Sequence, residues 1–203
     1  LIAAWKAGGI FVTVNPMNRA GELAVILEDA TPKAIVMEPQ LYDESYALLA
    51  DDVPRPTIVL TTSAATGLSE PYPIVLPADA ARTIPGVETL EGLVAAHDGE
   101  SVPDPDLAPG DAATIVFTSG TTGEPKATMH FHRDLMIIAD GYAKEVLGVT
   151  PEDVFVGSPP KAITVGLGGL AVFPLRFGAA AALLEQASPP NMIEIDHKHR
   201  ATD

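Results

Sequence analysis

Short runs of apolar residues alternate along the chain with segments in which apolar residues recur every three or four positions. The first pattern is typical of buried β-strands and the second of helices with one face on a core. Strands are predicted at 10–14, 34–37, 57–61, 112–117, 154–156 and 179–184. Helices are predicted at 1–7, 18–30, 43–50, 88–97, after residue 131 and near the C-terminus. This alternation predicts an α/β fold of parallel-sheet layers with helices on both faces.

For two of these helices, the sequence also predicts an N-cap residue or a buried face. Asn18 is expected to be the N-cap residue of the helix at 18–30, because its side chain can accept a hydrogen bond from the first turn. The helix after residue 131 has one apolar stripe, which we expect to pack in the core. The stripe consists of Leu135, Ile138, Tyr142 and Val146.

Residues 101–111 are rich in proline and aspartate and are the best candidate for a linker. The linker would separate a first α/β portion, residues 1–100, from a second portion, residues 112–203. The chain begins at Leu1 in the middle of a helical pattern, and no signal peptide is expected within its first residues. We therefore expect an interior segment of a longer protein, from the N-terminal domain of such a fold.

Composition excludes several classes of protein. The chain has 203 residues, with 12 Lys+Arg against 27 Asp+Glu and a net charge of −15, which argues against a nucleic-acid partner. Its 47% hydrophobic residues exclude a disordered acidic tail. The absence of Cys excludes disulfides, thiolate zinc sites and a Cys nucleophile. The charge-free stretch 162–175 is shorter than the ~20 residues of a membrane span. We expect a cytoplasmic protein without a membrane partner.

The segment 118–126 carries most of the functional information. It follows a predicted buried strand, and ligands of open α/β sheets bind beyond the carboxyl ends of strands. Gly120 and Gly123 let the backbone approach an anion closely, while Lys126 adds a positive charge. Hydroxyl donors come from Thr118, Ser119, Thr121 and Thr122. The alternative is a hydroxyl-rich surface loop, but the preceding strand and the Pro-Lys ending favour a site for a polyphosphate.

This segment resembles the signature T-S-G-[ST]-T-G-x-P-K of the adenylate-forming enzymes, a family of acyl- and aryl-CoA synthetases, nonribosomal adenylation domains and beetle luciferases. The resemblance extends to residues 4–16, 126–133 and 157–168, although Ala127 stands where glycine is usual. The segment 158–168 is most similar to benzoate- and 2-aminobenzoate-CoA ligases.

The resemblance implies an enzyme that acts in two half-reactions. A carboxylate and ATP give an acyl-adenylate and pyrophosphate, and coenzyme A then accepts the acyl group. The phosphate-binding residues would be Thr118, Ser119, Gly120, Thr121, Thr122, Gly123 and Lys126. Mg²⁺ is implied through the ATP phosphates, without a resident metal ligand in this chain. No certain catalytic residue is assigned.

The family carries a Tyr-Gly-x-Thr-Glu motif, a ribose-binding Asp and a late catalytic Lys, and none of these follows Gly178 here. We therefore expect that the 203-residue chain alone does not complete adenylation. Two alternatives to the CoA ligase stay open: an adenylation segment that serves a carrier protein, and a non-catalytic nucleotide-binding fragment.

The resemblance also implies an acid pocket. Its candidate residues are His132, Ser158, Ile163, Thr164 and Gly166. An aromatic acid is the favoured substrate, and a short or branched aliphatic acid is the alternative. Residues 162–165 could instead be core strand residues, and Lys161 is either a partner of the carboxylate or a solvated lysine.

The histidines and the exposed edges of the sheet suggest two further possibilities. The pairs His130/His132 and His197/His199 could bind zinc only if they converged. We favour instead a role for His132 near the nucleotide or the acid, and solvated positions for His197 and His199 on the last helix. Uncovered strand edges or apolar faces make a homodimer plausible.

Overall fold

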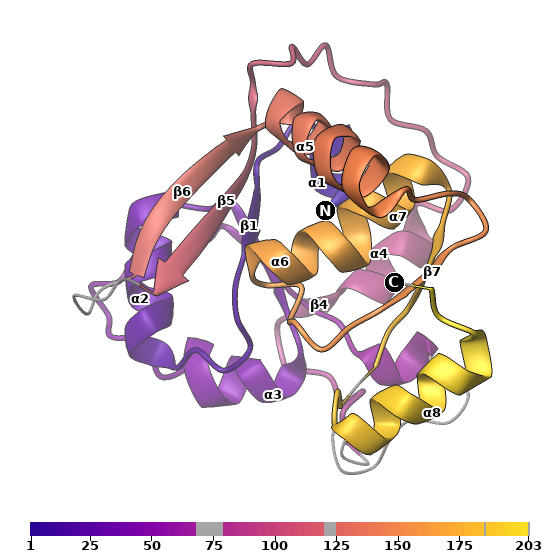
Figure 1. Ribbon diagram of the computed structural model, residues 1–203. Helices are drawn as coiled ribbons and strands as arrows, with labels where there is room; N and C mark the ends of the chain where they lie inside the picture. Colours follow the sequence, from indigo (N-terminus) through magenta and orange to yellow (C-terminus); the bar gives the residue numbers. More distant parts are fainter. Residues whose placement is uncertain (68–78, 120–124, 185, 203) are drawn as a thin grey trace. The chain divides into compact units, whose positions relative to one another are not determined.

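The computed structural model describes residues 1–67, 79–119, 125–184 and 186–202 (Figure 1). The helices are α1 (Ile2–Lys6), α2 (Ala20–Ala30), α3 (Pro39–Leu41), α4 (Leu90–Ala96), α5 (His132–Ile138), α6 (Thr164–Leu167), α7 (Phe173–Phe177) and α8 (Pro189–His199). Wider, π-helical turns form η1 (Tyr42–Tyr46), η3 (Ala139–Leu147) and η4 (Gly168–Val172), and η2 (Ala64–Gly67) is a 3₁₀ turn. The strands are β1 (Phe11–Thr13), β2 (Ala34–Met37), β3 (Ile58–Thr61), β4 (Glu88–Thr89), β5 (Ala112–Ser119), β6 (Pro125–Phe131), β7 (Val154–Val156) and β8 (Ala180–Ala182).

The described strands form three small sheets, with orders β1-β5-β6, β2-β3-β4 and β7-β8. The pairs β1/β5, β2/β3, β3/β4 and β7/β8 are all parallel. Parallel pairing requires crossover connections, which the intervening helical segments supply. The predicted α/β class with parallel sheets is therefore confirmed. Figure 1 adds one exception, because β5 and β6 run in opposite directions.

The chain divides into two compact units that follow strand pairing rather than chain order. Unit 1 comprises Leu1–Asn15, Asp104–Thr118 and Thr128–Asp203, and unit 2 comprises Pro16–Pro103 and Ser119–Ala127. The first residues belong to unit 1 because β1 pairs with β5. One boundary falls after Pro103, inside the predicted linker 101–111. The division into portions 1–100 and 112–203 stays a prediction.

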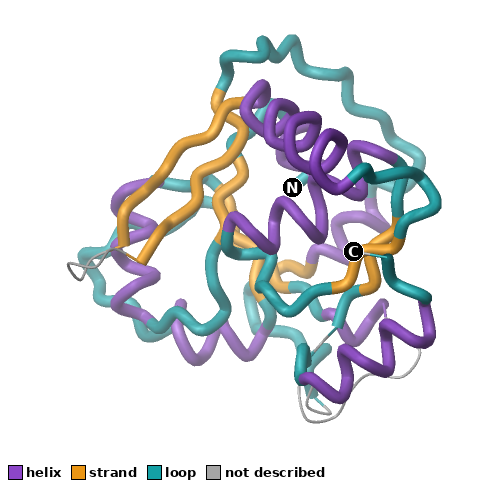
Figure 2. The backbone as a smooth tube through the Cα atoms, viewed as in Figure 1, coloured by secondary structure: helices purple, strands orange, loops and turns teal. Residues whose placement is uncertain are grey.

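The core of unit 1 corrects the predicted apolar stripe. Figure 2 shows α5 continuing into η3 as one helix. Its buried side chains are Leu135, Ala139 and Ala143. Ile138, Tyr142 and Val146, predicted as core residues, are 45%, 51% and 66% exposed. For Tyr142 and Val146 the physical reason is the π-helical segment from Ala139 onward, whose wider turns hold more residues than the assumed 3.6, whereas Ile138 precedes this segment.

In unit 2, α2 buries Leu23, Ile26 and Leu27, as its apolar spacing predicts. Its N-cap is Arg19 and not Asn18, so this expectation was wrong. The backbone N–H of Arg19 donates to Glu22 Oε2 at 3.0 Å, and the Glu22 carboxylate therefore fixes the first turn one residue later. The Asn18 carbonyl instead accepts a hydrogen bond from Ser45 Oγ.

Several boundaries also differ from the expectations. The helix expected at 43–50 is present as α3 and η1, which together span residues 39–46. The glycine-rich stretch 166–175 is helical, and residues 125–131 form a strand that the apolar pattern does not reveal. The last predicted helix is α8, on which His197 and His199 are exposed, as expected. In the described ranges, no helix is long and apolar enough to cross a membrane.

Glu91, in the first turn of α4, ties this helix to the segment after β3. Its Oε1 accepts hydrogen bonds from Thr62 Oγ1 at 2.6 Å and from the Ser63 backbone N–H at 3.3 Å. The Thr62 hydrogen bond is the largest of the effects that hold the pKa of Glu91 below its usual value. A lowered folded-state pKa means that the ionised carboxylate stabilises the fold above the unfolded pKa of about 4.3. This stabilisation is lost as the pH falls through the pKa that Glu91 has in the folded state.

We expect Glu91→Ala to lower the free energy of unfolding by about 1–2 kcal/mol at pH 7, because hydrogen bonds to a charged group are lost. Urea unfolding measures this change, and the difference from the parent chain should shrink as the pH is lowered below about 4. Asp98→Ala is the matched control, since Asp98 is exposed and has no hydrogen bond to any described residue. Equal losses at pH 7 and pH 3 would contradict the role of the Glu91 charge.

Candidate functional site

The strands β5 and β6 flank the predicted phosphate-binding segment. In the β1-β5-β6 sheet, β5 lies between its two neighbours, so that its backbone is held on both sides. Residues 120–124 lie outside the described residues, and with them Gly120, Thr121, Thr122 and Gly123. Thr118 near the end of β5 and Lys126 near the start of β6 are both exposed. The described ends of the two strands therefore fix where this segment begins and ends.

A cavity of about 290 Å³ lies within unit 1. Its walls come from β5, β6, α5 and the helical segment that runs from α6 through η4 to the first residue of α7. Most of the lining is apolar: Val116, Leu135, Ile138, Leu167, Gly168, Val172 and Phe173. Polar atoms come from Thr114, His130 and Thr164. An apolar cavity with a few polar groups is the usual form of a site for a small organic ligand.

One of the five residues predicted for the acid pocket lines this cavity, and the acid-binding role of all five stays a prediction. Only Thr164, the first residue of α6, is among the residues that line this cavity. Ser158 and Ile163 are exposed, and Gly166 is buried. Gly166 serves close packing, since a Cβ there would lie 2.1 Å from the carbonyl oxygen of Pro160.

His132 starts α5 and packs on an aromatic neighbour. Its ring meets that of Trp5 edge to face, with centroids 5.6 Å apart. The Trp5 indole N–H donates to the Ala113 carbonyl at 2.8 Å, which anchors α1 against β5. Nε2 of His132 is buried and has no hydrogen-bond partner among the described residues. Its side chain therefore contacts the core of unit 1, and its proposed nearness to a ligand stays a prediction.

The structure also locates Lys161 and His130. Lys161 is exposed and forms no ion pair within the described residues, while partial desolvation lowers the pKa of its ammonium group. His130, considered from sequence only as a possible metal ligand, lines the cavity from β6. Strand alternation after Lys126 was the signal that could have indicated it, because it places residues 126, 128 and 130 on one face of β6.

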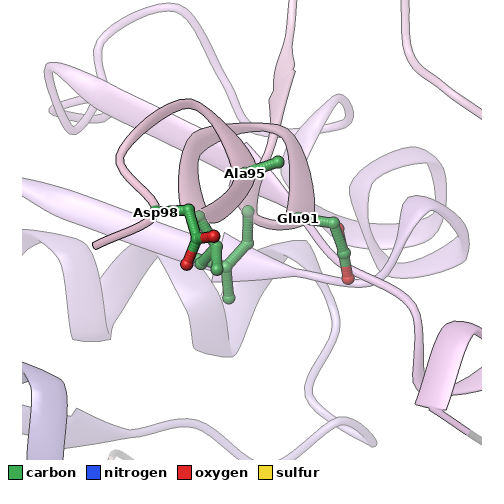
Figure 3. Close-up of a pocket in the computed structure, with 5 residues that line it drawn as sticks. Glu91, Ala95 and Asp98 are labelled. Atoms are coloured by element: carbon green, nitrogen blue, oxygen red, sulfur yellow. The ribbon is translucent and has the colours of Figure 1, made fainter. Parts of the chain in front are cut away.

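A second, more open cavity of about 430 Å³ lies along α4 in unit 2. Figure 3 shows Glu91 and Asp98 on opposite sides of the side chains that line it. Two carboxylates repel a carboxylate or phosphate ligand, and Glu91 is already hydrogen-bonded to Thr62 and Ser63. This surface therefore does not fit the chemistry predicted from the phosphate-binding segment.

Among the described residues, no group of three or more His, Asp or Glu side chains is arranged to hold a metal ion. In this part of the chain, His130 and His132 do not join His197 and His199 in a shared site. The zinc alternative finds no support there. The expectation that the chain has no resident metal ligand stays a prediction.

The family of the chain follows from comparison with known proteins. The chain belongs to the AMP-binding enzyme family, whose model matches residues 1–203. The benzoate–CoA ligase of Thauera aromatica is 26% identical over 98% of this chain and 34% of its own length. The L-proline–[L-prolyl-carrier protein] ligase of Streptomyces coelicolor is 32% identical over 77% of this chain and 27% of its own length. The chain thus spans about a third of these relatives.

A solved structure supports the same fold. The anthranilate CoA ligase AuaEII, crystallised in complex with anthranoyl-AMP, superposes with a TM-score of 0.79 at 20% sequence identity. The match covers 97% of this chain and 34% of that one. The fold is thereby that of the acyl-CoA synthetase-like adenylate-forming enzymes.

We expect Gly166→Ala to lower the free energy of unfolding by about 1–3 kcal/mol, because the new Cβ would overlap the Pro160 carbonyl. Thermal and urea unfolding measure the change. Gly169→Ala is the matched control, since no atom lies within 4 Å of the Cβ position there. Alanine at this helical position should leave stability unchanged or raise it by up to about 1 kcal/mol. Equal effects of the two substitutions would contradict the packing role of Gly166.

Proposed function

We propose that the chain is the part of an ATP-dependent acid–CoA ligase that binds the ATP phosphates and an aromatic acid. The observation that carries the proposal is the small apolar cavity at β6, the strand that continues from the phosphate-binding segment. Membership of the AMP-binding enzyme family supports the nucleotide. Benzoate and anthranilate, named in the relatives above, support an aromatic acid.

The ATP phosphates would be held by backbone N–H groups, hydroxyls and one cation. These come from Thr118, Ser119, Gly120, Thr121, Thr122, Gly123 and Lys126. The exposed Lys126 fits this role, because its ammonium can reach a ligand in solvent. Mg²⁺ would be held mainly through the phosphates, since the described residues offer no carboxylate cluster. Bound there, Mg²⁺ would neutralise charge on the phosphate oxygens.

The cavity favours a compact acid over a long-chain one. Its volume of about 290 Å³ lies at the lower end of the ~300–1,000 Å³ typical of small-molecule sites. A single aromatic ring can pack against Leu167 and Phe173, while the carboxylate would stay in contact with solvent, because apolar walls penalise a full charge. A short or branched aliphatic acid would fit the same volume and is the alternative substrate.

The proposed reaction has two steps. A carboxylate oxygen attacks the α-phosphorus of ATP, the bond from that phosphorus to the bridging oxygen breaks, and pyrophosphate leaves. The sulfur of coenzyme A then attacks the acyl carbon, its proton is released, and AMP departs. In the first step, the phosphate-binding residues hold the leaving pyrophosphate, so that positioning and charge neutralisation lower the barrier.

A carrier protein is the second candidate for the thiol acceptor. The similarity to the L-prolyl-carrier protein ligase favours it, because that relative is 32% identical over 77% of this chain. Both acceptors present a thiol, and none of the described residues distinguishes them. Acceptor competition with free coenzyme A and an isolated carrier domain, measured on the enzyme that contains this chain, would distinguish the two.

Lys126→Ala should weaken ATP binding by about tenfold or more, because a charge-assisted contact to phosphate is lost. Isothermal titration of the chain with Mg–ATP measures the affinity, and benzoate binding should not change. Lys144→Ala is the matched control, since Lys144 is an exposed lysine on η3. Unchanged ATP affinity in Lys126→Ala would refute the phosphate assignment.

Ile138→Trp should weaken benzoate binding by about tenfold or more and leave ATP binding intact, because the indole would fill the cavity that Ile138 lines. Ligand-observed NMR measures benzoate binding. Ile137→Trp is the control, since its side chain is 65% exposed and does not line the cavity. If both variants bind benzoate like the parent chain, the acid is not bound in this cavity.

A further inference from the structure

The polar side chains that line the unit 1 cavity differ in whether they already form a hydrogen bond within the protein. Thr114 is fully buried, and its Oγ1 donates to the Phe11 carbonyl at 2.7 Å. Its hydroxyl proton is therefore not available to a ligand. Thr164 stands at the start of α6 and is exposed. His130 is half-buried, and its ring nitrogens form no hydrogen bond with any described residue.

His130 is also the one titratable side chain among the described residues that line the cavity. A neutral imidazole has one N–H donor and one acceptor nitrogen, and both are available here. Since no described residue pairs with these nitrogens, a ligand in the cavity can supply the partner. The surrounding Leu167, Val172 and Phe173 offer no polar atom in their side chains.

The reacting carboxylate of the acid is not the best partner for His130. Apolar walls penalise burial of a full negative charge, which favours the open side of the site for that group. The ring of the acid would then occupy the cavity, and an amino or hydroxyl group on that ring would meet the imidazole. A ring hydroxyl can donate to the acceptor nitrogen of His130 or accept from its N–H, and a ring amino group can donate to the acceptor nitrogen.

We propose that His130 is a specificity-determining residue, which hydrogen-bonds an amino or hydroxyl substituent on the ring of an aromatic acid. This inference rests on the proposed function, because it assumes that the cavity holds the acid. It predicts that the chain prefers amino- or hydroxybenzoates to benzoate. A site that hydrogen-bonds a substituent discriminates against the analogue that lacks it, because that hydrogen bond is then missing.

The test is a comparison of four acids: benzoate, 2-aminobenzoate, 3-hydroxybenzoate and 4-hydroxybenzoate. Their dissociation constants are measured with the parent chain and with His130→Phe, which keeps an aromatic ring and removes both nitrogens. In the parent chain, at least one substituted acid should bind about three- to tenfold more tightly than benzoate. His130→Phe should remove this preference and leave benzoate affinity nearly unchanged.

Two further variants make the outcome specific to this side chain. His130→Gln, which restores a donor and an acceptor, should recover part of the preference. His199→Phe, an exposed position on α8, should behave like the parent chain. In NMR spectra, the His130 ring resonance should shift more with the preferred acid than with benzoate, and the His199 resonance should not shift.

The possible failures are distinguishable. If the parent chain binds aromatic acids without preference, or if the preference survives in both His130→Phe and His130→Gln, the role of His130 is overturned and the proposed function stands. If the folded parent chain binds none of the four acids, with or without Mg–ATP, the proposed acid site is overturned, and the inference falls with it. Circular dichroism establishes that each variant is folded.

Discussion

The parallel pairing of β1 with β5 is the interaction on which the rest of unit 1 depends. Residues 11–13 pair with residues 114–116, and closing so long a loop carries an entropic cost that local structure cannot offset. The pairing is reinforced by two side chains: the Trp5 indole donates to Ala113, and the Thr114 hydroxyl donates to Phe11. Together these two hydrogen bonds fix the register of β5 relative to β1. This register directs Thr114 and Val116 to the cavity and brings the end of the strand to the phosphate-binding segment.

Strong local signals explain which parts of the fold the sequence predicted. β5 was recognisable because Ala113 and Val116 belong to a continuous apolar run, as a strand covered on both sides requires. β6 was not, because polar and apolar side chains alternate irregularly along it, most of them are exposed, and its strand pairing depends on the rest of the sheet. The stripe on α5 failed for another reason. A periodicity of 3.6 was assumed, whereas η3 is π-helical from Ala139 onward.

The candidate site was predictable where chemistry is concentrated in consecutive residues. The phosphate-binding segment combines glycines, hydroxyls and a lysine, and such a combination is informative without coordinates. The cavity is not of this kind, because its lining comes from four elements and is mostly ordinary apolar side chains. Thr164 was anticipated from the resemblance alone. His130 was visible as a histidine, yet only the packing of β6 against α5 and α6–η4 turns it into a cavity residue.

The contact between Gly166 and the Pro160 carbonyl restricts how this site can change over evolution or by design. One wall of the cavity is built on a helix whose backbone touches the preceding turn, and no side chain can be added at Gly166 without moving both. The wall on α5 carries Ile138, which is 45% exposed, so that larger and smaller residues are tolerated there more easily. The shape of the cavity would therefore change by substitution on α5, while the wall at Gly166 stays as it is.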